Sequence, residues 1–114
     1  PLGRAIGEAA AKRLQNLLRS VVANGSGSQA EVPGYYSAGK TGTAEVPERG
    51  GYGDERISSF VGYAPADNPV LAALVILYKP QTETRYGSVL AAPVFREVME
   101  QSLSYLGVER RDAR

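Results

Sequence analysis

The residues best suited to chemistry gather in one short stretch, residues 34–44, which contains Lys40 and the hydroxyl side chains of Ser37, Thr41 and Thr43. The 114-residue sequence has no histidine and no cysteine, which excludes imidazole bases, thiolate nucleophiles and disulfides, and nearly every zinc site. Any chemistry must therefore use hydroxyl groups, lysine, carboxylates or backbone amides. No cofactor and no metal ion are expected.

Two patterns compete for this stretch. The segment Gly34–Thr41 satisfies the phosphate-loop expression G-x-x-x-x-G-K-[ST] at every position. A phosphate loop works because a hydrophobic strand enters it and a helix leaves it, so that the helix N-terminus faces the phosphates. Here a polar, turn-rich segment, residues 26–33, comes first, and Pro47 interrupts the residues that follow. A nucleotide-binding protein is therefore the alternative hypothesis, and it requires Lys40 to lie at the start of a helix.

The second pattern is Lys40-Thr41-Gly42, followed by Thr43-Ala44. In an extended strand, Lys40 and Gly42 project to one side and Thr41 and Thr43 to the other. A glycine inside a strand leaves room for another backbone or a ligand to come close. One short strand would thus offer a cation and two hydroxyl groups to different neighbours.

Hydrophobic periodicity predicts a helix at each end of the chain. Residues 7–23 form an amphipathic pattern, and Asn24-Gly25 is expected to end this helix in the left-handed conformation. The second helix has Pro93 in its first turn and ends at Gly107. Its predicted apolar side is formed by Val94, Phe95, Val98, Met99, Ser102, Leu103 and Leu106.

Three strands are predicted between the helices, over residues 35–44, 57–64 and 70–78. The last strand is apolar on both faces, as expected for a strand buried between layers, so the isolated chain should expose apolar surface where partner elements are missing. Residues 45–55 read as a charged, glycine-rich loop. The short turn at 65–69 makes the last two strands antiparallel.

These elements predict an α/β (α+β layered) unit, in which the first and last helices pack against three antiparallel strands. Residues 1–107 belong to this unit, and residues 108–114 are expected to be a frayed, charged tail. Thirteen Lys and Arg residues balance 12 Asp and Glu residues, so no nucleic-acid partner is indicated. The longest apolar run, residues 70–78, is too short to span a membrane.

The surroundings of Lys40-Thr41-Gly42 resemble a known family. The matching segments, taken together, are Val32–Tyr35, Ala38–Ala44, Ser59–Pro69 and Ala91–Phe95. They resemble the C-terminal part of the transpeptidase domain of class B penicillin-binding proteins, which belong to the penicillin-recognising serine transpeptidase and β-lactamase-like family. The resemblance implies part of a peptidoglycan D,D-transpeptidase, a serine acyltransferase that cross-links stem peptides and is acylated by β-lactams.

The same resemblance implies roles for four consecutive residues. Lys40 and Thr43 would be catalytic, because the Lys40 cation would hold a partner serine and the Thr43 backbone N–H would form part of the oxyanion hole. Lys40, Thr41, Gly42 and Thr43 would all bind substrate. The family implies that this strand borders the active-site cleft.

The sequence departs from the family pattern in its nucleophile. The family requires a Ser-x-x-Lys motif at a helix start and a separate Ser-x-Asn motif. Ser-x-Asn is absent, and Ser37 matches Ser-x-x-Lys only in letters, because Ser37 and Lys40 would point to opposite faces of a strand. We therefore expect the nucleophile N-terminal to Pro1 in a longer polypeptide, and we expect this chain alone to be inactive.

The expected partners are the N-terminal remainder of the domain with its two serine motifs, peptidoglycan stem peptides and β-lactam antibiotics. The resemblance also implies the bacterial cell envelope, at the extracytoplasmic face of the cytoplasmic membrane, with the anchor outside this chain. A non-catalytic penicillin-binding-like assembly module stays open as a further alternative. Tyr35 and Tyr36 are interpreted as packing residues, and the carboxylates of Glu45, Glu48, Asp54 and Glu55 as solvated loop charges.

Overall fold

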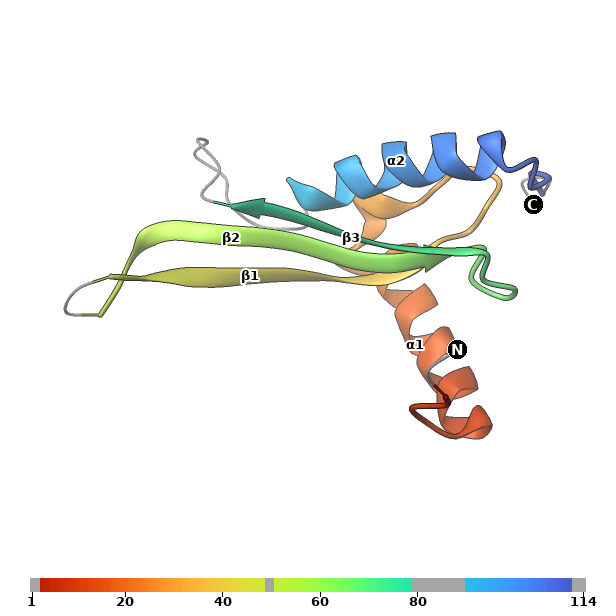
Figure 1. Cartoon of the computed structure of the whole chain (residues 1–114), viewed down its shortest axis with the longest axis horizontal. Coiled ribbons are helices and arrows are strands. Elements are labelled where there is room, and N and C mark those ends of the chain that lie inside the picture. The colour runs from red at the N-terminus through yellow and green to blue at the C-terminus, as the bar shows by residue number, and fades with distance from the viewer. Residues whose placement is uncertain (1–2, 49–50, 79–89, 112–114) are drawn as a thin grey trace.

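The computed structural model describes residues 3–48, 51–78 and 90–111, with the backbone alone for residues 46–48 and 51–55 (Figure 1). The elements are α1 (Glu8–Asn24), a single 3₁₀ turn η1 (Ser28–Ala30), β1 (Ala38–Glu48), β2 (Gly51–Ala64), β3 (Leu71–Tyr78) and α2 (Ala91–Tyr105). This order confirms the predicted helix, three strands and helix. In Figure 1, α2 covers one face of the sheet, and α1 projects away from the opposite side. No helix in the described ranges is long and apolar enough to cross a lipid bilayer.

The strands form one antiparallel sheet in the order β1-β2-β3. Thr41, Phe60 and Val75 are register partners on the face that α2 covers, and Lys40, Val61 and Leu74 are partners on the other face. Burial along β3 alternates accordingly, because every second side chain points toward α2. The prediction that β3 is buried on both faces is therefore correct for one face only. On the other face, Leu74, Ile76 and Tyr78 are exposed in the described structure.

The predicted boundaries of β1 were wrong at both ends. The strand begins at Ala38 rather than residue 35, because Tyr36 has a left-handed φ of 57° and lies in a turn. The predicted loop at residues 45–55 is instead largely strand, since β1 and β2 continue pairing beyond Glu45 and Arg56. Pro47 is accommodated at a register shift of an edge strand, where its missing N–H is tolerated.

The core lies between the sheet and α2. Phe60 is fully buried, and its ring centroid lies 4.6 Å from that of Phe95 on α2. Phe95, Met99 and Leu103 follow one another at a spacing of four residues and form the buried side of α2. The predicted apolar side also contained Val94, Val98 and Leu106, but these three are exposed. The buried stripe is therefore narrower than predicted.

The C-terminal ends of the two helices differ in backbone conformation. Gly107 has a φ of 77° and ends α2 in the left-handed conformation, as predicted. The predicted conformation was wrong for α1, because Gly25 is extended, with a φ of −129°. Gly25 and Gly27 both donate their backbone N–H to the Val21 carbonyl oxygen, at 3.1 and 3.0 Å. Both bonds converge on one carbonyl oxygen, and α1 ends without a left-handed residue.

The described part of the C-terminal tail, residues 108–111, makes hydrogen bonds to two turns. The Tyr35 hydroxyl donates to the Val108 carbonyl oxygen at 3.0 Å, and Arg110 donates to the Pro33 carbonyl oxygen at 2.7 Å. The Arg111 side chain hydrogen-bonds the exposed Asp67 carboxylate and holds its pKa below the usual value of 3.8. The tail thus ties the turn before β1 to the turn between β2 and β3.

Replacing Phe60 with alanine should lower the free energy of unfolding of this chain by about 3–5 kcal/mol, because a fully buried ring is removed. Val61→Ala is the matched control, since Val61 is the next residue and is 51% exposed; its effect should be below about 1 kcal/mol. Urea unfolding followed by circular dichroism measures both. Similar losses for the two variants would contradict the packing described here.

Candidate functional site

The four predicted site residues lie together in the middle of β1. The register pairs Lys40 with Val61, Thr41 with Phe60, Gly42 with Ser59 and Thr43 with Ser58. Lys40 and Gly42 therefore face away from α2, and Thr41 and Thr43 face toward it, as the sequence predicted. No helix starts at Lys40, so the phosphate-loop hypothesis is wrong.

β1 is an edge strand of the described sheet, and the Lys40 ammonium lies at this edge. Its Nζ donates to the carbonyl oxygen of Thr41 at 3.0 Å and to the Thr41 hydroxyl at 3.3 Å. Because the Thr41 side chain belongs to the opposite face of the sheet, the ammonium must reach around the strand edge. The edge thus presents an exposed cation next to a hydroxyl group and to main-chain hydrogen-bonding groups.

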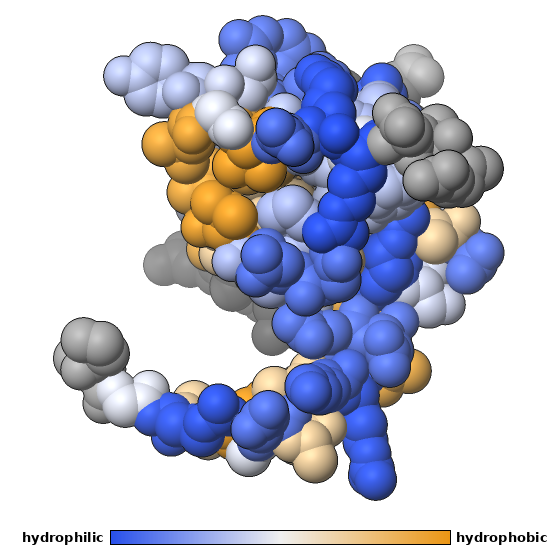
Figure 2. Space-filling view, turned by 90° about the vertical axis from the view of Figure 1, so that its right-hand side faces the viewer, coloured by the Kyte–Doolittle hydropathy of each residue, from blue (hydrophilic) through white to orange (hydrophobic). Residues whose placement is uncertain are grey.

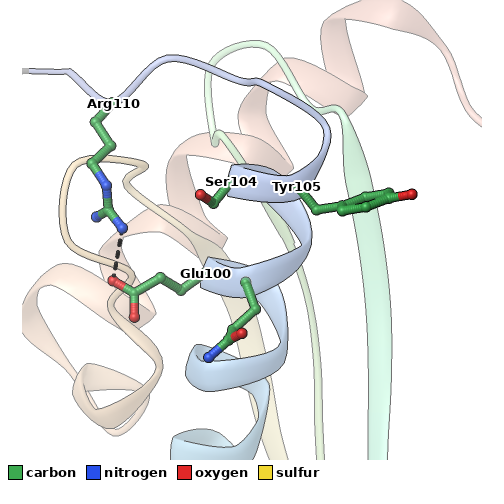
Figure 3. Close-up of a pocket in the computed structure, with 5 residues that line it drawn as sticks. Glu100, Ser104, Tyr105 and Arg110 are labelled. Carbon is green, nitrogen blue, oxygen red and sulfur yellow. Dashed lines mark hydrogen bonds and ion pairs between the residues drawn. The ribbon is translucent and has the colours of Figure 1, made fainter.

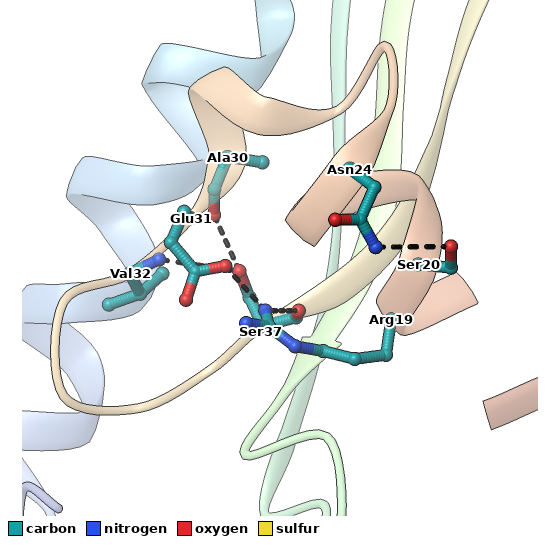
Figure 4. A network of polar contacts seen from close by, with 7 residues as sticks. All are labelled: Arg19, Ser20, Asn24, Ala30, Glu31, Val32 and Ser37. Atoms are coloured by element: carbon teal, nitrogen blue, oxygen red, sulfur yellow. Dashed lines mark hydrogen bonds and ion pairs between the residues drawn. The ribbon is translucent and has the colours of Figure 1, made fainter. Parts of the chain in front are cut away.

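Ser37 is buried and has a structural role. Its hydroxyl donates to the Ala30 carbonyl oxygen at 2.6 Å and accepts a hydrogen bond from the Val32 N–H at 3.3 Å (Figure 4). The side chain has no exposed surface. A serine that is enclosed in this way cannot reach a substrate carbonyl. This agrees with the interpretation that Ser37 and Lys40 are not a catalytic Ser-x-x-Lys motif.

Glycines 39 and 42 allow β1 to pack closely against β2. A Cβ atom at Gly39 would lie 2.4 Å from the Val61 carbonyl oxygen and 2.6 Å from the Phe60 ring. A Cβ atom at Gly42 would lie 2.6 Å from the Ser59 hydroxyl. The sequence suggested that Gly42 makes room for a ligand, and in the structure its missing side chain leaves room for the Ser59 hydroxyl.

The other predicted residues fall outside the Lys40 region or outside the described side chains. Tyr35 is buried and hydrogen-bonded to the tail, which confirms a packing role. Glu45 is a strand residue and forms an ion pair with Arg56 at 3.9 Å, so it is not a loop charge. The side chains of Glu48, Asp54 and Glu55 lie outside the described part. Among the side chains that are described, no group of three or more acidic residues could hold a metal ion.

A hollow of about 400 Å³ lies beside the C-terminal end of α2 (Figure 3). Its lining includes Glu100, Ser104 and Arg110, and Arg110 Nη2 donates to the Glu100 carboxylate at 3.2 Å. Because this hollow is on the α2 side of the sheet, it is separate from the Lys40 side chain. The ion pair across it belongs to the contacts that anchor the tail.

Sequence reasoning missed the polar network at the start of β1. Arg19 on α1 donates to the Glu31 carboxylate and, at 2.7 Å, to the Ser37 carbonyl oxygen (Figure 4). Its guanidinium carbon also lies 5.3 Å from the centroid of the Tyr36 ring. No signal in the sequence indicated these contacts, since Arg19 occupies an ordinary polar position of an amphipathic helix.

Comparison with known proteins identifies the domain family to which the chain is similar. Residues 2–100 match the family "Penicillin binding protein transpeptidase domain". The chain is 42% identical over 107 residues to stage V sporulation protein D of Bacillus subtilis, covering 93% of this chain and 17% of that protein. It is 41% identical to the probable peptidoglycan D,D-transpeptidase PenA of Neisseria flavescens, covering 92% of this chain and 27% of that protein.

Solved structures agree with the sequence matches. The transpeptidase domain of Burkholderia pseudomallei penicillin-binding protein 3 superposes with a TM-score of 0.88 at 33% identity, covering 97% of this chain and 34% of that one. Mycobacterium tuberculosis penicillin-binding protein 3, solved with ampicillin, gives a TM-score of 0.80 at 30% identity, with 96% and 27% covered. The chain thus spans well under half the length of these relatives.

The two glycines of β1 should differ in their tolerance of alanine. Gly39→Ala must displace a backbone oxygen and a buried ring, and should lower the free energy of unfolding by about 1–3 kcal/mol. Gly42→Ala meets only a rotatable hydroxyl and should cost less than about 1 kcal/mol. In a Ser59→Ala background even that smaller cost should disappear. Equal costs for the two glycines, measured by urea unfolding, would show that the strands are not packed as described.

Proposed function

Because this chain belongs to the penicillin-binding protein transpeptidase domain family, we propose that it supplies the Lys-Thr-Gly strand of a peptidoglycan D,D-transpeptidase. Such an enzyme transfers an acyl group from one stem peptide to a serine and then to the amine of a second stem peptide. The supporting observation is that Lys40-Thr41-Gly42-Thr43 lies on an open edge strand with the Lys40 ammonium at that edge.

In this proposal Lys40 acts through its charge. Its ammonium attracts the carboxylate of a stem peptide or a β-lactam and orients the hydroxyl of a serine from the rest of the domain. The ammonium lies exposed at the edge of β1, beside a sheet face on which Val61 and Leu74 follow Lys40 in register. When a substrate covers this face and excludes water, the electrostatic attraction becomes stronger than in solvent.

Thr43 has a different role, through its backbone. When the nucleophilic serine oxygen attacks the substrate carbonyl carbon, negative charge develops on the carbonyl oxygen, and the Thr43 N–H donates a hydrogen bond to it. A fixed donor of this kind typically contributes about 3 kcal/mol to transition-state stabilisation. The C–N bond to the leaving amine then breaks, the amine takes up the proton released by the serine hydroxyl, and an acyl-enzyme remains. The Thr41 and Thr43 hydroxyls bind polar groups of the substrate.

An extended stem peptide fits the edge of β1. A strand edge offers alternating N–H and C=O groups, and an added peptide can satisfy them as a further antiparallel strand. Pairing along this edge would place the peptide next to the Lys40 ammonium. The substrate would therefore be positioned mainly by main-chain hydrogen bonds and its carboxylate by the lysine.

The remainder of the domain is proposed to cover the face that Lys40 shares with exposed apolar side chains. Val61, Leu74, Ile76 and Tyr78 on this face are each more than half exposed. Such a patch is typical of an unfilled interface. Figure 2 shows an open notch between α1 and the rest of the chain, on the side away from α2. A segment that docks here would bring the Ser-x-x-Lys and Ser-x-Asn motifs toward Lys40.

Residues 1–107 would thus form the C-terminal portion of the transpeptidase domain. By analogy with the family, the whole protein is proposed to work at the bacterial cell envelope, on the extracytoplasmic side of the cytoplasmic membrane. β-Lactams would bind as substrate analogues. The similar penicillin-binding protein 3 of Mycobacterium tuberculosis forms a complex with ampicillin, which supports this class of ligand.

The role of Lys40 can be tested in the polypeptide that contains both this chain and the nucleophilic serine. Lys40→Met should lower the rate of acylation by a fluorescent penicillin about 100-fold, because a preorganised charge is lost at the reacting centre. Lys12→Met is the control, since Lys12 is an exposed residue of α1 that forms an ion pair with the equally exposed Glu8. An unchanged rate for Lys40→Met would contradict the catalytic role of Lys40, whereas absence of acylation in the parent protein would favour an assembly module.

A further inference from the structure

We propose that Arg19 is a positioning residue for the Lys-Thr-Gly strand. By holding the Tyr36-Ser37 corner, Arg19 fixes the point at which β1 starts and so the placement of Lys40 and Thr43. This inference rests on the proposed function, because its effect is expressed through the reaction at Lys40. It does not require Arg19 to touch the substrate.

The contacts of Arg19 converge on one corner of the backbone. A single guanidinium nitrogen, Nη1, donates to the Glu31 carboxylate and to the Ser37 carbonyl oxygen, and the guanidinium carbon lies over the Tyr36 ring. The side chains of Arg19 and Glu31 are 28% and 32% exposed, so the charges are paired in a partly dry setting. Hydrogen bonds between charged partners in such settings are stronger than neutral ones.

The corner itself is conformationally demanding. Tyr36 has a φ of 57°, which is uncommon for a residue other than glycine. Its N–H donates to the Val32 carbonyl oxygen at 3.2 Å, and its own carbonyl oxygen accepts from the Ala66 N–H at 2.8 Å. The chain therefore changes direction at Tyr36, and the surrounding structure must maintain that conformation.

Arg19 connects this corner to an element outside the sheet. The register of β1 with β2 starts at Ala38, so the Ser37 carbonyl lies just before the sheet. Arg19 gives this carbonyl a charged donor from α1, whereas Ala66 holds Tyr36 from the turn after β2. Two separate elements thus fix consecutive residues immediately before the strand begins.

The distance to the site is short. Lys40 lies three residues beyond Ser37, which corresponds to about 10 Å along an extended strand. β1 is paired on one side only within the described sheet, so its free edge depends on the anchor at its start. Since an error of about 1 Å in the position of a catalytic group can cost about 100-fold in rate, even slight loosening at the corner has a measurable effect.

The three contacts at position 19 require an arginine. A planar guanidinium can donate to two acceptors and stack on an aromatic ring at the same time, whereas an ammonium group behaves as a point charge. A lysine at position 19 would keep the charge but could not reproduce all three contacts. This difference separates the geometric role of Arg19 from its charge.

The test compares Arg19→Met, Arg19→Lys and the control Arg13→Met, since Arg13 is an exposed arginine on the same helix. In the polypeptide that contains the nucleophilic serine, fluorescent penicillin is used to measure reversible binding and the acylation rate constant separately, well below the melting temperature. Arg19→Met should lower the acylation rate constant about 10-fold and weaken reversible binding by a smaller factor. Arg19→Lys should fall in between, and Arg13→Met should equal the parent.

Hydrogen–deuterium exchange of the 114-residue chain gives a second readout that does not need the nucleophile. The amides of residues 38–43 should exchange faster in Arg19→Met than in the parent, while those of β3 should not change. If Arg19→Met fails to fold, Glu31→Ala removes one of the two polar partners and should show the same pattern to a smaller extent.

The outcomes separate the two proposals. Unchanged acylation together with unchanged exchange in Arg19→Met would overturn the role of Arg19. A uniform increase in exchange over all three strands would also overturn it, because Arg19 would then be a general stability residue. Absence of penicillin labelling in the parent would overturn the proposed function instead, and faster exchange confined to residues 38–43 would still support the anchoring by Arg19.

Discussion

The fold depends on the packing of one phenylalanine over two glycines that face each other across the sheet. Gly39 and Gly62 are register partners, and a Cβ atom on either would lie within 3 Å of the Phe60 ring. Because both positions lack a side chain, the ring can lie close to the backbone of β1 and β2 and contact Phe95 on α2. α2 is thereby packed against β2 and β3, the two strands that follow β1 in the sheet.

This packing holds the start of β1 against β2 on the face toward α2. Phe60 of β2 packs against Gly39, and Phe95, Met99 and Leu103 of α2 complete the core behind it. The opposite face and the outer edge remain open, and Lys40 lies at that edge. A strand that is rigid on one face and accessible on the other is what electrostatic preorganisation requires, since its donors must not move when charge develops. The corner at Tyr36 and the anchored tail extend the same rigidity to the beginning of β1.

Much of this architecture could be predicted from the sequence, because helical periodicity and alternating hydrophobicity are local signals. The motif at Lys40 was also visible, and its sidedness followed from the period of a strand. The start of β1 was not predictable, since the left-handed conformation of Tyr36 is imposed by hydrogen bonds with Val32 and Ala66. The extended β1–β2 ribbon was mistaken for a loop because glycine and charged residues are also tolerated in exposed paired strands. The contacts of Arg19 with Ser37 and of Arg110 with Pro33 could not be predicted, because these partners lie 18 and 77 residues away in the chain.

Whether this chain completes an acylation site can be decided by where a covalent penicillin label appears when the site is assembled from two pieces. The 114-residue chain is mixed with a separately produced polypeptide that contains the Ser-x-x-Lys and Ser-x-Asn motifs, and a denaturing gel resolves the two after reaction with fluorescent penicillin. We expect label on the serine-bearing polypeptide only when this chain is present, and loss of that label when Leu74→Lys places a charge in the docking face. Label on the 114-residue chain itself, or equal labelling of the partner without it, would show that the Lys-Thr-Gly strand does not have the role proposed for it.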